Sequence, residues 1–292
     1  MPEFKMPVRE QNSNKGTFGK VLNFCGSENY IGASYLATVS SLKVGAGFSA
    51  LATVQGVINS VSTLLPEAVY LTREQGLEKI NEFSVVLIGC GLGVSEESKV
   101  LMEKIFEKIN PKIPIVIDAD GLNLLAGVNA GVNRESKPEK KVLCIELPKR
   151  LYDTEKIITP HPLEASRLLG VSLKYILENL ESSAKALSVK YKCITVLKTH
   201  RTVICDRDLN IYINQHGNSA LAKSGSGDVL AGIIAGLLAQ GMNGVEACKL
   251  GVYLHSRTGE IASEELTEYS VLASDIPKYL HKAIKEIIKN QV

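Results

Sequence analysis

Short apolar runs rich in β-branched residues recur along this chain, separated by stretches of mixed polarity. The runs lack polar alternation and end in glycine or polar residues; they are Val21–Phe24, Val85–Ile88, Ile113–Ile117, Ile157–Ile158, Ile194–Leu197 and Thr202–Cys205. Runs of this kind are typical of parallel strands that are buried on both faces of a sheet.

Apolar residues at helical spacing occupy most of the intervening stretches. The predicted helices are Ala33–Ala46, Glu96–Ile109, Glu164–Leu169, Ser182–Tyr191 and Val245–Leu266. This alternation of strands and helices favours an α/β layer sandwich with a mostly parallel sheet. The segments 202–206 and 210–215 predict a small antiparallel hairpin, because the polar turn Asp-Arg-Asp-Leu-Asn joins them.

The length of the chain limits the number of domains. Its 292 residues suffice for one large α/β domain or two small ones, and 45% of them are hydrophobic. The composition shows no strong break, so we expect one domain over residues 15–292 after a flexible leader, residues 1–14. The polar, Lys-rich segment 127–156 predicts a surface insertion.

Charge and cysteine content exclude several classes of protein. The formal net charge is only +2, aromatic residues make up 5% and Trp is absent, which argues against nucleic-acid and membrane-surface binding. The six cysteines form no CxxC pair, so we expect reduced, buried thiols rather than a zinc site or disulfides. The N-terminus lacks a signal-peptide pattern and the apolar run 229–239 is too short to span a bilayer, so we expect a cytoplasmic protein.

Glycine or polar clusters follow four of the predicted strands, where open α/β sheets bind their ligands. These clusters are GSENYIGAS (26–34), IGCGLG (88–93), DADGLN (118–123) and ITPHPLEA (157–165). The first fits an ordinary strand-to-helix turn equally well. The second is not a dinucleotide fingerprint, because Val94 stands where the third glycine belongs, but it would let a ligand approach the backbone.

Two of these clusters carry side chains with both a structural and a chemical interpretation. Asp118 and Asp120 could cap the following helix or reach a phosphate-bound magnesium ion, and capping is the favoured interpretation for at least one of them. His161, held between Pro160 and Pro162, fits a structural role and an exposed functional role about equally.

The stretch NSALAKSGSGDVLAGIIAGLLAQG (218–241) is the most informative one. Gly225, Ser226 and Gly227 precede an apolar helix, which predicts a nest of backbone N–H groups that forms an anion hole. Asp228 follows directly. A plain helix cap would not require a carboxylate beside a bound phosphate, so Asp228 is the candidate base that takes a proton from an attacking hydroxyl.

With these residues assembled, the chain resembles the ribokinase-like superfamily, and within it the ADP- or ATP-dependent NAD(P)H-hydrate dehydratases. The resemblance covers about residues 15–282 and rests on seven motifs in order: Lys15–Gly19, GASYLA (32–37), GCGLG (89–93), DADGLN, TPHPLE, KTHRT (198–202) and GSGDVLAGIIAGLLAQG (225–241). The tail YLHSRTGEIASEE followed by VLASDI is also similar to the end of that family.

The resemblance implies a three-layer α/β/α sandwich and a lyase that repairs hydrated NADH or NADPH by phosphorylating the ring hydroxyl and eliminating phosphate. It implies that the hydrated ring is lined by Ala33, Gly91, His161 and Asp228. It implies that the adenine nucleotide is held by Lys198, Thr199, His200, Arg201, Thr202 and Gly227. ADP or ATP with Mg²⁺ and a homo-oligomer such as a tetramer are expected, without a metal site built from protein ligands alone.

Several departures from the family pattern keep alternatives open. Thr199 stands where a glycine is expected, Cys90 replaces a usual proline, and Lys223-Ser224 replaces Thr-Gly. An ATP-dependent kinase of a small hydroxylated metabolite, such as a vitamin precursor or sugar, would share the GSGD helix start, whereas TPHPLE with DADGLN favours the dehydratase. A nucleotide-binding regulator without catalysis is a third alternative. The sequence separates neither ADP from ATP nor the two hydrates.

Overall fold

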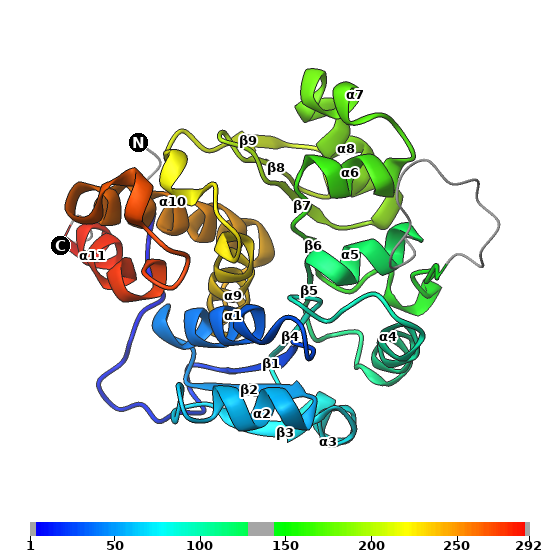
Figure 1. Ribbon diagram of the computed structural model, residues 1–292, viewed down its shortest axis with the longest axis horizontal. Helices are drawn as coiled ribbons and strands as arrows, with labels where there is room; N and C mark the ends of the chain where they lie inside the picture. The colour runs from blue at the N-terminus through cyan, green and yellow to red at the C-terminus, as the bar shows by residue number, and fades with distance from the viewer. Residues whose placement is uncertain (1–3, 128–142, 290–292) are drawn as a thin grey trace.

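The computed structural model describes residues 4–127 and 143–289, and these residues form one nine-stranded sheet in the order β3-β2-β1-β4-β5-β6-β7-β8-β9 (Figure 1). The strands are β1 (Lys20–Phe24), β2 (Phe48–Thr53), β3 (Val69–Thr72), β4 (Val85–Ile88), β5 (Ile115–Ile117), β6 (Lys156–Ile158), β7 (Ile194–Leu197), β8 (Val203–Cys205) and β9 (Ile211–Ile213).

Eleven α-helices occur in the described residues. They are α1 (Ile31–Lys43), α2 (Gln55–Val61), α3 (Arg73–Lys79), α4 (Glu96–Lys108), α5 (Ala119–Ala126), α6 (Pro162–Leu169), α7 (Leu173–Glu178), α8 (Leu180–Tyr191), α9 (Ser226–Ala239), α10 (Gly244–Ser270) and α11 (Ile276–Lys289). Single 3₁₀ turns lie at Ile80–Glu82, Lys149–Leu151 and Ser219–Leu221.

The helices cover both faces of the sheet, so the predicted three-layer α/β/α sandwich is confirmed (Figure 1). Consecutive residues of β4 point to opposite faces. Leu87 packs into one core with α1, α9, α10 and α11, while Ile88 packs into the other with α3, α4, α5, α6 and α8. Both faces of the central strands are therefore buried, which explains their uninterrupted apolar sequences.

The first seven strands of the sheet, from β3 to β7, pair in parallel, and β7, β8 and β9 pair antiparallel. Cys205 is the register partner of Thr195 on one side and of Ile211 on the other. The turn between β8 and β9 is held by Asp206, whose Oδ1 accepts from the backbone N–H groups of Asp208 and Asn210 at 2.9 Å. The predicted hairpin is confirmed.

Helix α9 lies in the interior, between the sheet and the neighbouring helices α1 and α10 (Figure 1). Gly232 makes the close approach to α1 possible, because a Cβ atom there would lie 2.2 Å from the carbonyl oxygen of Ala37. Nearly every residue of α9 is buried. The rigid interior of this helix fixes its first turn at the carboxyl edge of the sheet.

Several elements of the structure are not predicted from the sequence, namely β2, β3, α2, α3, α7 and the amphipathic α11. The predicted surface insertion 127–156 is wrong at its end, because Lys156 is the buried first residue of β6. Residues 128–142 of this segment lie outside the described residues. In the described part of the leader, Phe4 stacks on Tyr253 at 4.6 Å between ring centroids, and Arg9 donates to the Gly45 carbonyl. The domain boundaries stay a prediction.

All six cysteines are free thiols in the structure, and five of them are buried. Cys144 is the exception and is exposed. Within residues 4–127 and 143–289, no helix combines the length and the apolar character needed to cross a bilayer.

Candidate active site

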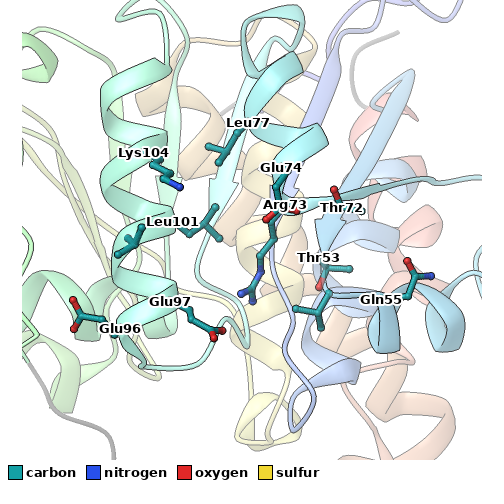
Figure 2. A pocket seen from close by; sticks show the side chains of 12 residues that line it. Thr53, Gln55, Thr72, Arg73, Glu74, Leu77, Glu96, Glu97, Leu101 and Lys104 are labelled. Atoms are coloured by element: carbon teal, nitrogen blue, oxygen red, sulfur yellow. The ribbon is translucent and has the colours of Figure 1, made fainter.

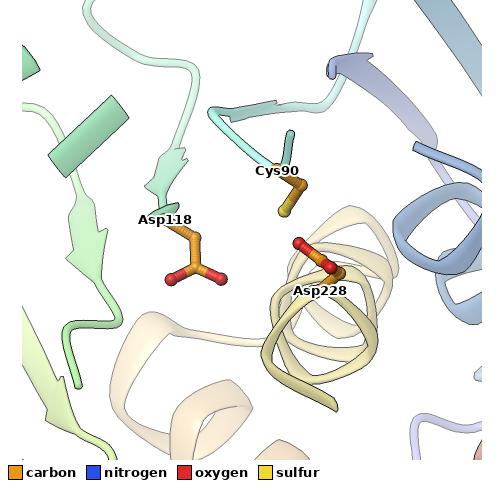
Figure 3. A group of neighbouring side chains, drawn as sticks. All are labelled: Cys90, Asp118 and Asp228. Carbon is orange, nitrogen blue, oxygen red and sulfur yellow. The ribbon is translucent and has the colours of Figure 1, made fainter. Parts of the chain in front are cut away.

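Two features lie at the carboxyl edge of the parallel strands. One is a groove between α3 and α4 (Figure 2). The other is a group of polar side chains, the buried Cys90 and Asp118 and the half-buried Asp228, which come from the ends of β4 and β5 and from the first turn of α9 (Figure 3). The second feature contains the residue on which the sequence analysis places the chemistry.

The start of α9 has the geometry of an anion-binding nest. Gly225 adopts a left-handed conformation with φ of 90°, and Ser226 begins the helix directly after it. A Cβ atom on Gly225 would lie 2.5 Å from Leu36 Cδ1, so glycine is required there both for φ and for space. Within the described chain the backbone N–H groups of Gly227 and Asp228 donate to no protein acceptor, and they stay available for an anion.

Ser226 itself is fixed from behind by a buried histidine. Its hydroxyl lies 3.0 Å from Nε2 of His255, a buried residue of α10. Burial lowers the pKa of His255 to about 4, so this imidazole is neutral near pH 7. His255 could not be identified from the sequence, because a lone histidine in a helix carries no signal without the tertiary contact.

A buried ion pair lies beside the nest. Lys198 Nζ is 2.6 Å from Asp118 Oδ1, and the Asp118 side chain is almost fully buried. Lys198 also lies against the start of α9, since a Cβ atom on Gly227 would be 3.1 Å from Nζ. Burial alone would lower the pKa of Lys198, but the carboxylates of Asp118 and Glu164 raise it above its ordinary value. The ammonium group is therefore charged and next to the nest.

Asp228 is a half-buried acid with a shifted pKa. Burial and, to a smaller extent, the neighbouring Asp118 raise the pKa of Asp228 to about 7, although Lys198 and the thiol of Cys90 act in the opposite direction. A carboxylate with a pKa near 7 is a suitable proton acceptor at neutral pH. The predicted catalytic residue thus lies where burial and charge tune it for that role.

The capping interpretation of the two aspartates in DADGLN is wrong. Asp118 occupies the N-cap position of α5, but its side chain makes no capping hydrogen bond and pairs with Lys198 instead. Asp120 Oδ2 accepts from the backbone N–H of Gly93 at 2.8 Å, which ties the GCGLG loop to α5. Ala119, between them, has a positive φ of 47°, a strained conformation that orients both neighbours.

His161 has the structural role that its sequence context allows, and its functional role stays a prediction. Its Nδ1 accepts from the backbone N–H groups of Leu163 and Glu164, so the ring caps α6, and Glu164 accepts from the His161 N–H in return. The side chain is still half-exposed. Burial and the positive charge of Lys198 lower the pKa of His161 to about 4. Because Nδ1 is an acceptor, the neutral ring carries its proton on Nε2.

The predicted substrate residues from the first two glycine clusters lie together. Gly91 has φ of 63°, and a Cβ atom there would lie 2.7 Å from the Cβ atoms of Ala33 and Tyr30. The backbones of both loops are joined, because Gly26 N–H donates to the Cys90 carbonyl at 2.9 Å. Ala33 and Gly91 thus form a close-packed surface next to Cys90.

The predicted nucleotide residues divide into two groups. Lys198 points toward Asp118 and the nest, whereas Thr199, His200, Arg201 and Thr202 form the turn between β7 and β8. In that turn Thr199 Oγ1 donates to the Arg201 carbonyl at 2.7 Å and Thr202 Oγ1 donates to the Thr199 carbonyl at 3.1 Å. Thr199, where the family pattern has glycine, is therefore accommodated by a side-chain hydrogen bond.

Cys90, Asp118 and Asp228 place their ligand atoms within 4.8 Å of one another (Figure 3). The donor set does not match a resident hard cation, because Mg²⁺ disfavours thiols and Asp118 is already paired with Lys198. The two carboxylates could still bind a Mg²⁺ ion that arrives with a phosphate group. Such an ion takes few ligands from the protein and the others from substrate oxygens and water.

Comparison with known sequences extends over most of the chain. The model of the NAD(P)H-hydrate dehydratase family matches residues 21–282. A bifunctional NAD(P)H-hydrate repair enzyme from Thermofilum pendens is 33% identical over 97% of this chain and 53% of that protein. An ADP-dependent (S)-NAD(P)H-hydrate dehydratase from Neisseria meningitidis is 33% identical over 88% of this chain and 81% of its own length. This chain spans about half of the length of the bifunctional relatives.

Solved structures agree with the sequence comparison. The ADP/ATP-dependent NAD(P)H-hydrate dehydratase from Bacillus subtilis, co-crystallized with ATP and Mg²⁺, matches with a TM-score of 0.80 at 28% identity, over 96% of this chain and 94% of that one. A ribokinase-like superfamily protein from Enterococcus faecalis matches with a TM-score of 0.80 at 26% identity, over 97% and 92%. The ribokinase-like fold is confirmed, and the chain belongs to the NAD(P)H-hydrate dehydratase family.

Proposed function

We propose that this chain dehydrates hydrated NADH or NADPH in a reaction driven by ADP or ATP, with Asp228 as the base. The observation that carries this proposal is the position of Asp228, a carboxylate with a pKa of about 7 in the first turn of α9, directly behind the Gly225–Gly227 nest. Membership of the family supports the dehydratase over the kinase of a small metabolite, which the same helix start would also fit.

In the first step the ring hydroxyl attacks the terminal phosphorus of the nucleotide. The new O–P bond forms as the bond to the leaving nucleotide oxygen breaks, and the hydroxyl proton passes to the Asp228 carboxylate. Two kinds of donor stabilise the negative charge of the transferring phosphoryl group. They are the free N–H groups of Gly227 and Asp228, which belong to the nest, and the ammonium group of Lys198 beside it. The protein thus contributes positioning and charge stabilisation.

In the second step the phosphorylated oxygen leaves as phosphate. The lone pair of the ring nitrogen expels it. The ring carbon next to the one that carried the oxygen then releases a proton to water, which restores the double bond of the dihydronicotinamide. We assign the neutral imidazole of His161, whose Nε2 lies 3.4 Å from Glu164 Oε1, and the surface formed by Ala33 and Gly91 to the binding of the ring. A hydroxyl group alone is a poor leaving group, which is why phosphorylation comes first.

Magnesium fits this scheme as a companion of the nucleotide. When bound, it would neutralise phosphate charge, with the carboxylates of Asp118 and Asp228 as the protein ligands within reach. The turn Thr199–Thr202 between β7 and β8 is the candidate nucleotide contact. A cytoplasmic location and a homo-oligomeric assembly belong to the same proposal.

The test supplies hydrated NADH or hydrated NADPH with ADP or ATP and follows the return of dihydronicotinamide absorbance. We expect recovery that requires one of the two nucleotides and that releases one phosphate per dinucleotide repaired. Recovery without phosphate release would contradict the phosphorylation step. Absence of recovery together with a stable phosphorylated product from another alcohol would identify a kinase instead.

A further inference from the structure

The groove between α3 and α4 (Figure 2) has a volume of about 620 Å³. It lies at the carboxyl ends of β2 and β3, the same edge of the sheet at which α9 begins. Thr53 at the end of β2, Arg73 at the start of α3 and Glu97 at the start of α4 surround its mouth. Leu77, Val100 and Leu101 give it an apolar interior. This volume accommodates a nucleoside-sized group.

The groove is joined to the surface formed by Ala33 and Gly91 next to Cys90, called the ring surface below, through the backbone of Gly26. The Gly26 carbonyl accepts from Arg73 Nη2 at 3.1 Å and from Thr53 Oγ1 at 3.4 Å, while Gly26 N–H contacts the Cys90 carbonyl. Strands β2 and β3 lie two and three positions from β4 in the sheet. Because neighbouring strands lie ~4.8 Å apart, the groove begins ~10 Å from the ring surface, on the side of the sheet away from β7.

Arg73 carries an unsatisfied donor at this mouth. Its Nε is buried and has no hydrogen-bond partner among the described residues, and no described carboxylate lies within ion-pair distance of its guanidinium group. A guanidinium group with a free N–H is a strong site for a phosphate oxygen. The part of a ligand that reaches Arg73 is thus expected to be anionic.

The lining of the groove as a whole carries a net negative charge. Three carboxylates, those of Glu74, Glu96 and Glu97, face the two cations Arg73 and Lys104, which leaves a formal charge of −1. A carboxylate accepts hydrogen bonds from the hydroxyls of a ribose, whereas a ribose that carries a 2′-phosphate would bring two further negative charges toward it. The lining therefore suits an unmodified ribose attached to a diphosphate.

We propose that this groove binds the adenosine-diphosphate half of the hydrated dinucleotide, with Arg73 on the diphosphate and Glu97 on a ribose hydroxyl. The same lining makes hydrated NADH the preferred substrate over hydrated NADPH. The inference rests on the proposed function, because it takes the ring of the same molecule to lie beside Asp228. The nucleotide co-substrate then enters from the opposite side, along β7 and β8.

The kinetic test compares wild type with Glu97→Gln, Val100→Phe and the matched control Glu107→Gln, an exposed residue of α4 outside the groove. We expect wild type to prefer hydrated NADH by ~10-fold or more in kcat/KM. Glu97→Gln should reduce this preference several-fold. Val100→Phe fills the groove and should raise the KM of both hydrates ~10-fold without changing the KM of ATP, and Glu107→Gln should match wild type.

A binding measurement separates this inference from the proposed function. ADP-ribose, which lacks the nicotinamide, is titrated into each variant in the presence of a saturating non-hydrolysable ATP analogue. Binding to wild type that Val100→Phe weakens about 10-fold supports the groove, even where a dehydratase assay shows no turnover and so overturns the proposed function. Turnover by wild type with unchanged KM and ADP-ribose affinity in Val100→Phe would overturn the groove alone. A wild-type preference for hydrated NADPH would overturn the selectivity.

Discussion

The ammonium group of Lys198 lies 2.6 Å from the carboxylate of Asp118, a residue 80 positions earlier in the chain. Lys198 follows β7 and Asp118 follows β5, with β6 between them, so the contact spans the carboxyl edge of the sheet. It holds a cation against the first turn of α9. It also sets the electrostatic environment of Asp228, because Lys198 lowers and Asp118 raises the pKa of that acid.

The Lys198–Asp118 pair makes the effects of single and double substitutions differ. Lys198→Met leaves the Asp118 carboxylate buried and unpaired, so we expect a loss of about 3–5 kcal/mol in the free energy of unfolding. The double variant Lys198→Met with Asp118→Asn should recover most of this loss while it stays inactive. Urea unfolding of the three proteins measures the effect. A single variant as stable as the double variant would contradict the pairing.

Removal of the candidate base should separate chemistry from binding. Asp228→Asn keeps the shape of the side chain but cannot accept the hydroxyl proton, so kcat should fall by ~10²–10⁴. Nucleotide affinity should stay within a few-fold of wild type, because the N–H groups of the nest are unchanged. Single-turnover phosphate release and nucleotide calorimetry give the two quantities. Loss of nucleotide binding in this variant would show instead that Asp228 shapes the nest.

The shifted pKa of Asp228 predicts the pH dependence of the reaction. Because burial raises this pKa to about 7 and the base acts as carboxylate, kcat/KM should rise with pH and level off above a midpoint near 7. Substitution of Asp118 by Asn removes a neighbouring negative charge, so the pKa of Asp228 should fall. The rise of kcat/KM should then occur at lower pH. The measurement is a profile of kcat/KM between pH 5 and 9. A profile that falls through pH 7 would require the protonated form and would exclude the base role.

His161 allows its cap and its donor to be tested separately. Asn is a good N-cap, so His161→Asn should retain the start of α6 and lose only the Nε2–H donor, which raises the KM of the hydrate. His161→Ala loses both and should cost about 1 kcal/mol of stability in addition. Thermal unfolding and steady-state kinetics of both variants provide the readout. Equal KM values for wild type and His161→Asn would confine His161 to its structural role.

The sequence predicts which residues belong to the site better than it predicts the contacts between them. The nest at Gly225–Gly227 and the exposed His161 follow from local rules, since positive φ, proline restriction and helix starts act over a few residues. The Lys198–Asp118 pair does not, because it depends on which strand ends the topology brings together. Local propensity favours Asp118 as a helix cap, but in the structure its side chain forms an ion pair with Lys198 instead.

The missed elements have two different causes. β2 has the sequence FSALAT, whose small residues carry little β propensity, and its position between β1 and β3 decides its conformation. For α11 the signal was present, because its buried residues recur at helical spacing: Ile276, Leu280, Ala283 and Ile287. The groove beside α3 could not be predicted from sequence, since its walls come from three separate strand ends.

The half-buried carboxyl of Asp228 should cost stability above neutral pH. Its folded-state pKa of about 7 lies above the ordinary value of 3.8, so the stability that its neutral form provides is complete below about pH 4 and is lost as the pH rises through 7. Asn cannot ionise, so Asp228→Asn should gain stability over wild type, from near zero at pH 4 to at most about 4 kcal/mol at pH 9. Lost attraction to Lys198 will reduce this gain. Urea unfolding at several pH values measures it, with Asp208→Asn in the exposed β8–β9 turn as the control. A gain in stability of the same size at pH 5 and pH 9 would show that ionisation of the Asp228 carboxyl does not destabilise the folded protein.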